Sequence, residues 1–174
     1  MKDLKRSNFS ENDWFDDDDE DSQKDQYLTF RIQNSVYGIP IRNVTEIISM
    51  QEITEIPEMM KFVKGIINLR GNVIPVIDVR IRFQMEEREF DEYTCIVIVN
   101  ISELSVGLIV DTVNEVVTIP AEDISQAPQL QKGGSSRFIN RMGRAGKGVI
   151  ILVDLEKFLK DEEMSALSTI AENG

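Results

Sequence analysis

Apolar and polar residues alternate along most of the chain from residue 27 onward, in short runs separated by turn-forming residues. In the first run, Leu28, Phe30 and Ile32 alternate with polar side chains, the period-two pattern of a half-buried β-strand. Further runs follow at 36–41, 44–48, 63–69, 73–77, 95–99, 104–110, 113–119 and 149–153. Because turn signals interrupt these runs roughly every 8–12 residues, the pattern predicts a mainly β fold of the sandwich or barrel type.

The end of the chain has a different spacing. Apolar residues recur there at helical intervals, with lysine and glutamate on the other face: Leu155, Phe158, Leu159, Leu167 and Ile170. Asp154 precedes this segment and can cap a helix. We therefore predict a C-terminal amphipathic helix over roughly 154–170 that packs on the β-structure. The aspartate at the equivalent position of the earlier repeat, Asp78, is predicted to cap a helix in the same way.

The sequence also contains an internal repeat. The segment 28–48 aligns without gaps on 97–117, with an identical glycine and an identical glutamate in each copy. Farther along, 73–79 aligns on 149–155, again with an identical aspartate. The second copy is longer between these two segments, which predicts a loop insertion between Val117 and Phe138. Two alignments in the same order indicate a duplication.

Each copy has about 70 residues and about five strands, which is marginal for an independent domain. We predict two pseudo-duplicated five-stranded β-barrel subdomains that share a seam and exchange elements there. The first barrel is expected at roughly 27–92 and the second at roughly 93–153. A seam between two barrels is a natural groove for a ligand or a partner.

Charge separates the segment 1–26 from the rest of the chain. It holds ten acidic and four basic residues, half of the net charge of -12, and only a few large apolar side chains. Such a composition does not offset the entropy cost of ordering a backbone, so we predict a disordered acidic tail over 1–26. The acidic run 16–21 lacks the glycine and the final glutamate of a calcium-binding loop.

Composition excludes several classes of function. The absence of histidine rules out serine–histidine and cysteine–histidine catalysis and imidazole metal sites, and a single cysteine, Cys95, cannot form an internal disulfide. A sequence pI near 4.5 argues against nucleic-acid binding, which needs a basic face. No apolar stretch has the length of a membrane span, and no signal-peptide core is present at the start.

The two copies differ most at 64–72 and 140–148. Only the first has Asn68, Arg70 and Gly71, where alternation about Leu69 predicts that Asn68 and Arg70 share a face and that Gly71 begins a turn. The guanidinium of Arg70 can bind a carboxylate or a carbonyl of a partner. It can equally form a surface salt bridge worth about 0–1 kcal/mol. The residues alone leave both possibilities open.

Several segments resemble the chemotaxis coupling proteins of the CheW family. They are Val36-Tyr37-Gly38-Ile39, Val44-Thr45-Glu46-Ile47, Phe62-Val63-Lys64-Gly65, Asn68-Leu69-Arg70-Gly71 and Ile74-Pro75-Val76-Ile77-Asp78-Val79-Arg80. The later segments 106–111, 127–128 and 150–154 fit the same family. The match spans about 27–170, nearly the whole chain outside the acidic tail.

This resemblance implies an adaptor with no catalysis, cofactor or metal of its own. CheW proteins link methyl-accepting chemotaxis receptors to the histidine kinase CheA. The cytoplasmic hairpin tip of the receptor docks in the groove between the barrels, and the regulatory domain of the kinase pairs barrel to barrel. The location implied is the cytoplasm, at membrane-associated receptor arrays. The partner-binding residues carried over are Val44, Glu46, Gly65, Asn68, Arg70 and Gly71, with Val116 expected to face Val44 across the groove.

Alternatives remain at each level. Val44, Ile47 and Val116 can line an apolar trough for a helical partner or can be plain core residues, and the repetition of Glu46 as Glu115 fits a role in the fold. The glycines can simply serve turn geometry. At the level of function, the alternatives are an adaptor of a related non-flagellar chemosensory pathway and a metal-dependent hydrolase that uses aspartate and glutamate clusters.

Overall fold

The structure is a computed structural model, and it describes residues 23–127, 137–146 and 148–173. Most of the predicted acidic tail and most of the predicted loop insertion lie outside the described residues. The described chain begins before residue 27, since Gln23 is buried and the carbonyl of Asp25 accepts a hydrogen bond of 2.8 Å from the Ile119 N–H.

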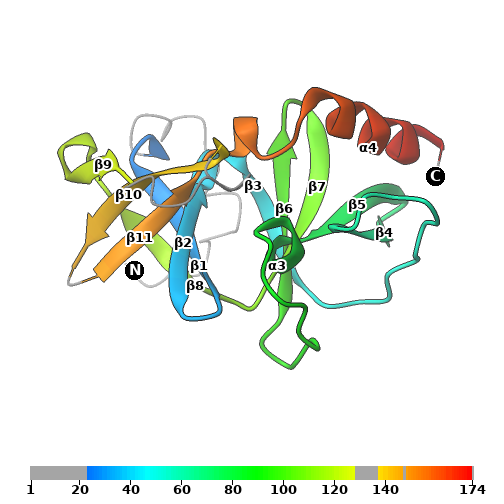
Figure 1. Cartoon of the computed structure of the whole chain (residues 1–174), viewed down its shortest axis with the longest axis horizontal. Coiled ribbons are helices and arrows are strands. Elements are labelled where there is room, and N and C mark those ends of the chain that lie inside the picture. Colours follow the sequence, from blue (N-terminus) through cyan, green and yellow to red (C-terminus); the bar gives the residue numbers. More distant parts are fainter. Residues whose placement is uncertain (1–22, 128–136, 147, 174) are drawn as a thin grey trace, which may run out of the picture.

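Two β-sheets lie side by side, and a helix near the C-terminus runs above one of them (Figure 1). The six-stranded sheet has the order β8-β1-β2-β11-β10-β9. Its strands are β8 (Thr112–Thr118), β1 (Gln26–Ile32), β2 (Ser35–Pro40), β11 (Gly148–Val153), β10 (Ile139–Ala145) and β9 (Ile124–Gln126). The five-stranded sheet has the order β3-β6-β7-β5-β4. Its strands are β3 (Val44–Ser49), β6 (Cys95–Ile101), β7 (Leu104–Val110), β5 (Asn72–Asp78) and β4 (Val63–Leu69).

These sheets confirm the predicted mainly β fold and the internal repeat. When the two copies of the repeat are aligned, the first five strands of the six-stranded sheet correspond one by one to those of the five-stranded sheet. The six-stranded sheet has one strand more than predicted, the short edge strand β9. The word barrel applies only loosely, because in the described part of the chain neither sheet is closed by pairing between its two edge strands.

Each sheet mixes strands from both copies of the repeat. The hairpin β1–β2 belongs to the first copy but pairs with β8 and β11 of the second. The hairpin β6–β7 belongs to the second copy but pairs with β3 and β5 of the first. The two copies have therefore exchanged a hairpin, and neither sheet can form from one copy alone.

A shared core joins the two sheets and the end of the chain. Its center is a series of aromatic contacts, with ring centroids 5.0 Å apart for Tyr37 and Phe83, 5.6 Å for Phe83 and Phe138, and 5.2 Å for Phe138 and Phe158. These side chains come from the first hairpin, the segment after β5 and the segments on either side of β10 and β11. Packing among them fixes the relative position of the sheets.

Short helical turns follow β5 and β11, and each is capped by an aspartate as predicted. The prediction of one helix over 154–170 was wrong, because Asp154 caps only a 3₁₀ turn and the C-terminal helix begins separately at Asp161. Asp78 Oδ1 accepts a hydrogen bond of 3.0 Å from the Arg80 N–H at the start of α3 (Val79–Arg82). Asp154 Oδ1 accepts one of 3.0 Å from the Glu156 N–H at the start of η6 (Leu155–Lys157). The other 3₁₀ turns are η3 (Ile41–Asn43) and η4 (Ala121–Asp123).

The C-terminal helix α4 (Asp161–Asn173) begins after η6 and packs along β5. Arg82 fixes the start of this helix: its Nε donates to the Phe158 carbonyl at 3.0 Å, and its Nη2 pairs with Glu163 at 3.0 Å. The guanidinium also lies 4.4 Å from the centroid of the Phe62 ring. Burial lowers the pKa of Arg82 from its usual value, and Glu163 partly offsets this shift.

Candidate functional site

The predicted site residues Asn68, Arg70 and Gly71 lie together at the turn between β4 and β5. Leu69 pairs with Asn72, so Arg70 and Gly71 form a two-residue hairpin loop. Both have positive φ, +52° for Arg70 and +88° for Gly71, as a type I′ turn requires. The turn thus begins at Arg70 instead of Gly71, and Arg70 projects from its tip, with a largely exposed side chain, instead of from a strand face.

Asn68 and Gly71 fix the shape of this turn. The Gly71 N–H donates a hydrogen bond of 2.9 Å to Asn68 Oδ1. A Cβ at position 71 would meet nothing within 4 Å, so glycine serves the left-handed conformation of the backbone here and not a close contact. The Asn-Leu-Arg-Gly sequence therefore holds one guanidinium at a rigid tip.

Arg70 forms an ion pair with Glu46 on β3. Because β3 and β4 are the two edge strands of the five-stranded sheet, this ion pair bridges the opening that hydrogen bonds do not close. The side chain of Arg70 is 68% exposed and that of Glu46 is 28% exposed. A pair this exposed contributes only about 0–1 kcal/mol to stability, so its charges remain available to a partner at low cost.

A β-bulge decides how the residues of β3 are oriented. Val44 pairs with Val99 and Glu46 with Ile98, so the register shifts between them. In a regular strand these two side chains would share a face, but the bulge puts Val44 in the core, only 3% exposed, and brings Glu46 to the surface. Ile47 is 39% exposed. Because the register is regular from Glu46 onward, Ile47 lies on the opposite face of β3 from Glu46, the face that Val44 also has after the bulge.

Gly65 lies inside β4, next to a second register shift. A Cβ there would come within 2.1 Å of the Thr54 carbonyl oxygen. Thr54 exchanges two backbone hydrogen bonds of 2.9 Å with Ile66. Gly65 therefore lets the segment between β3 and β4 lie directly against the strand.

Val116 lies in the other sheet. It pairs with Leu28 and packs, half-buried, against the shared core. The neighboring Glu115 is exposed, and its backbone exchanges hydrogen bonds of 2.7 Å and 3.1 Å with the Thr29 hydroxyl. Glu115 corresponds to Glu46, but the residue that corresponds to Arg70 is Gly146. Position 146 therefore offers no side chain for the ion pair that Arg70 forms in the five-stranded sheet.

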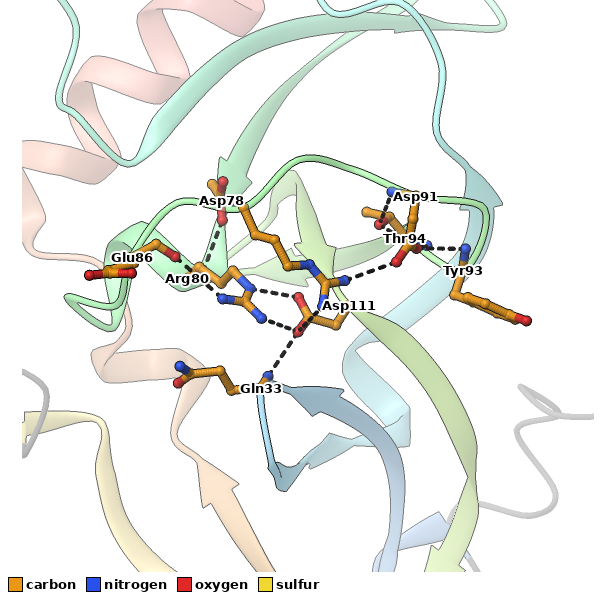
Figure 2. A network of polar contacts seen from close by, with 9 residues as sticks. Gln33, Asp78, Arg80, Glu86, Asp91, Tyr93, Thr94 and Asp111 are labelled. Carbon is orange, nitrogen blue, oxygen red and sulfur yellow. Dashed lines mark hydrogen bonds and ion pairs between the residues drawn. The ribbon is translucent and has the colours of Figure 1, made fainter.

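A buried polar network, which the sequence analysis did not identify, holds the two sheets together (Figure 2). Arg80 donates to both carboxylate oxygens of Asp111, at 2.8 Å from Nε and 2.6 Å from Nη2. The Gln33 N–H, at the turn of the exchanged hairpin β1–β2, donates to Asp111 Oδ2 at 2.8 Å. Asp111 thus connects the end of β7 in one sheet with a turn of the other.

Burial would raise the pKa of Asp111, but the hydrogen bonds from Arg80 and Gln33 outweigh it and hold the pKa below its usual value. Asp78, also buried, has its pKa raised, chiefly by burial, and its Oδ2 has no hydrogen-bond partner in the described structure. Both carboxylates are buried and belong to the network that stabilizes the fold.

Among the described residues no cluster of three or more potential metal ligands occurs. The described helices include none long and apolar enough to span a membrane.

Three comparisons with known proteins identify the same family. The family model of the CheW-like domain matches residues 26–163. The chain is 35% identical to a chemotaxis protein CheW of Klebsiella aerogenes, over 85% of this chain and 89% of that protein. It is 32% identical to a chemotaxis protein CheW of Treponema pallidum, over 83% and 88%. The crystal structure of a scaffolding protein CheW from Thermoanaerobacter tengcongensis superposes with a TM-score of 0.72 at 33% identity, covering 80% of this chain and 94% of that one.

Proposed function

The chain belongs to the CheW-like family, whose members are non-catalytic adaptors of chemotaxis, and we propose that it couples methyl-accepting receptors to the histidine kinase CheA. Its place in this proposal is the cytoplasmic face of membrane-associated receptor arrays. The partners are the cytoplasmic hairpin tip of a receptor and the regulatory domain of the kinase. The chain itself is an adaptor and not an enzyme.

The observation that carries the assignment of the site is the ion pair of Arg70 and Glu46. It places two opposite charges at the surface of the five-stranded sheet: Glu46 on β3, and Arg70 on a turn whose geometry Asn68 and Gly71 hold fixed. Ile47, which follows Glu46, adds an exposed apolar side chain on the other face of the edge strand β3. A helical partner needs this combination of an apolar contact and charges that fix its register. We propose that these residues form the binding surface, while Val44 and Gly65 support it from the core and the strand.

Val116 is proposed to contribute from the six-stranded sheet. Its half-buried side chain leaves part of its surface for contact, and it belongs to the strand that corresponds to β3. A partner that contacts both Ile47 and Val116 would bind across the two sheets.

Reversal of one charge tests the proposal. We expect Arg70→Glu to keep the fold but to lose co-sedimentation with receptor-containing membranes and CheA, because Glu46 then faces a like charge and the partner loses its cation. Lys157→Glu, the same change at an exposed position on η6, is the matched control and should co-sediment normally. The double variant Glu46→Arg/Arg70→Glu restores the ion pair in reverse, which separates its role in the fold from its role in binding. Normal assembly of Arg70→Glu would exclude this surface.

A further inference from the structure

The loop between α3 and β6, residues 84–94, is the acidic loop. It projects from the molecule below α3 (Figure 1). Among the described residues only four large apolar side chains are exposed, and two of them lie here: Phe90, 41% exposed, and Tyr93, 65% exposed. Two exposed aromatic side chains in one short loop are candidates for the anchors of a protein contact.

The acidic loop is joined to the fold by a hydrogen bond near its start and is closed by its own hydrogen bonds near its end (Figure 2). At one end, Arg80 Nη1 donates to the Glu86 carbonyl at 3.3 Å. At the other, the backbone N–H groups of Tyr93 and Thr94 donate to Asp91 Oδ1 at 2.8 Å and 3.1 Å. The hydrogen bond from the Tyr93 N–H is the main reason why the pKa of Asp91 lies below its usual value. A loop ordered before binding loses less entropy when a partner docks.

The charge of the acidic loop selects the partner. The loop contains five acidic residues and one basic residue. Lys64 pairs with Glu87, and Arg88 pairs with Asp91. No ion pair involving the other three, Glu86, Glu89 and Glu92, is found among the described residues, and all three are exposed. Exposed carboxylates beside aromatic side chains attract a basic segment and repel an acidic one.

Charge also argues against two other occupants. The segment 1–26 carries a net charge of -6, so it is repelled by the acidic loop. A second copy of the chain would bring its own acidic surface, since the whole protein has a net charge of -12. A basic segment of another protein has no such penalty.

The acidic loop is separate from the Arg70 surface. Lys64, which pairs with the loop, is near the start of β4, whereas Arg70 follows its end. Six residues of extended strand separate them by about 20 Å. A partner on the acidic loop can therefore bind while the Arg70 surface is occupied.

We propose that the acidic loop is a docking surface for a basic segment of a partner protein, with Phe90 and Tyr93 as its apolar anchors. This interaction goes beyond the coupling role assigned to the Arg70 surface and does not depend on it. The lysine or arginine side chains of the segment pair with Glu86, Glu89 and Glu92, and its aliphatic side chains cover the two rings.

A peptide titration of the full chain tests the proposal. The probe is a short fluorescein-labeled peptide of alternating lysine and leucine, followed by anisotropy, with a glutamine-for-lysine peptide as the uncharged comparison. We expect Phe90→Ala/Tyr93→Ala and Glu89→Lys/Glu92→Lys each to weaken binding about tenfold. The matched control Glu122→Lys/Asp123→Lys makes the same change in net charge at exposed positions of η4 and should bind like the parent chain.

Circular dichroism establishes that each variant is folded, and four results would overturn the proposal. If Glu89→Lys/Glu92→Lys and Glu122→Lys/Asp123→Lys weakened peptide binding equally, the net charge of the chain and not the acidic loop would account for binding. If Phe90→Ala/Tyr93→Ala bound the peptide as tightly as the parent chain, Phe90 and Tyr93 would not be anchors. Stronger peptide binding after deletion of residues 1–22 would make that segment of the chain the occupant. Self-association of the parent chain in sedimentation that the aromatic variant abolishes would make a second copy the occupant.

Discussion

At the scale of single residues, Asp111 connects the two sheets through hydrogen bonds. It receives two hydrogen bonds from Arg80, on the helix α3 that follows β5, and one from the backbone of Gln33, in the turn between β1 and β2 of the other sheet. Arg88 approaches the same carboxylate from the acidic loop, at 3.7 Å. One buried carboxylate is thus surrounded by partners from three segments, and two of these partners are arginines in different environments.

This arrangement predicts very different effects for the two arginines. Arg80→Met leaves the buried carboxylate of Asp111 without its main partner and should lower the free energy of unfolding by about 3–5 kcal/mol. Arg88→Met removes a side chain that is 44% exposed and should lower it by at most about 1 kcal/mol. Urea-induced unfolding of both variants measures the difference. Equal effects would mean that the Arg80–Asp111 pair does not hold the sheets together.

Some of these polar contacts could be predicted from the sequence, and others could not. The capping roles of Asp78 and Asp154 could be predicted, because an N-cap needs only an aspartate just before a helical turn. The pair of Arg80 and Asp111 could not, because its members are far apart in the sequence and meet only once β5 and β7 lie side by side. Contacts set by tertiary packing leave no local pattern.

At the scale of elements, the two edge strands of the five-stranded sheet determine which side chains are exposed at its surface. Alternation predicted the strands well, but it left the facing of Val44 open and misplaced Arg70. The bulge in β3 turns Val44 into the core, and the hairpin loop begins one residue earlier than expected. A bulge changes which face of the strand the following side chains occupy, and a two-residue loop takes a residue out of the strand. The period-two pattern alone detects neither change.

The segment that lies along β4 provides a test at this scale. Gly65→Ala places a Cβ 2.1 Å from the Thr54 carbonyl oxygen and should lower the free energy of unfolding by at least about 2 kcal/mol. Gly71→Asn is the matched control, because asparagine tolerates a positive φ and the site has open space, so its cost should stay below about 1 kcal/mol. Thermal unfolding compares the two. An equally stable Gly65→Ala would show that the Thr54 segment moves away easily.

At the scale of the whole molecule, the exchanged hairpins make the two copies of the repeat depend on each other. Residues 23–88 contain β1 and β2 of one sheet and β3, β4 and β5 of the other. The remaining residues hold the complementary strands. The sequence predicted the duplication and an exchange of elements at the seam, but the identity of the exchanged strands came only from the pairing.

This dependence predicts the behavior of a divided chain. Fragments 23–88 and 89–174, each alone and dilute, should lack a folded monomer. Each has the inner hairpin of one sheet without its flanking strands, and flanking strands of the other sheet without its inner hairpin. Mixed at equal concentration, they should restore the far-ultraviolet circular dichroism and the dispersed amide spectrum of the intact chain. A fragment that folds by itself as a monomer would contradict the exchange.

Hairpin exchange also explains how one sheet can carry Arg70 while the other carries Gly146 at the same position. Two identical half-length chains that swapped a hairpin would form a two-fold symmetric dimer, in which every residue occurs at both sites. Fusion of the two into a single gene removes that constraint, since each position can then change in one copy alone. We infer that the Arg70–Glu46 ion pair arose after such a fusion, as a break in the symmetry of an ancestral dimer.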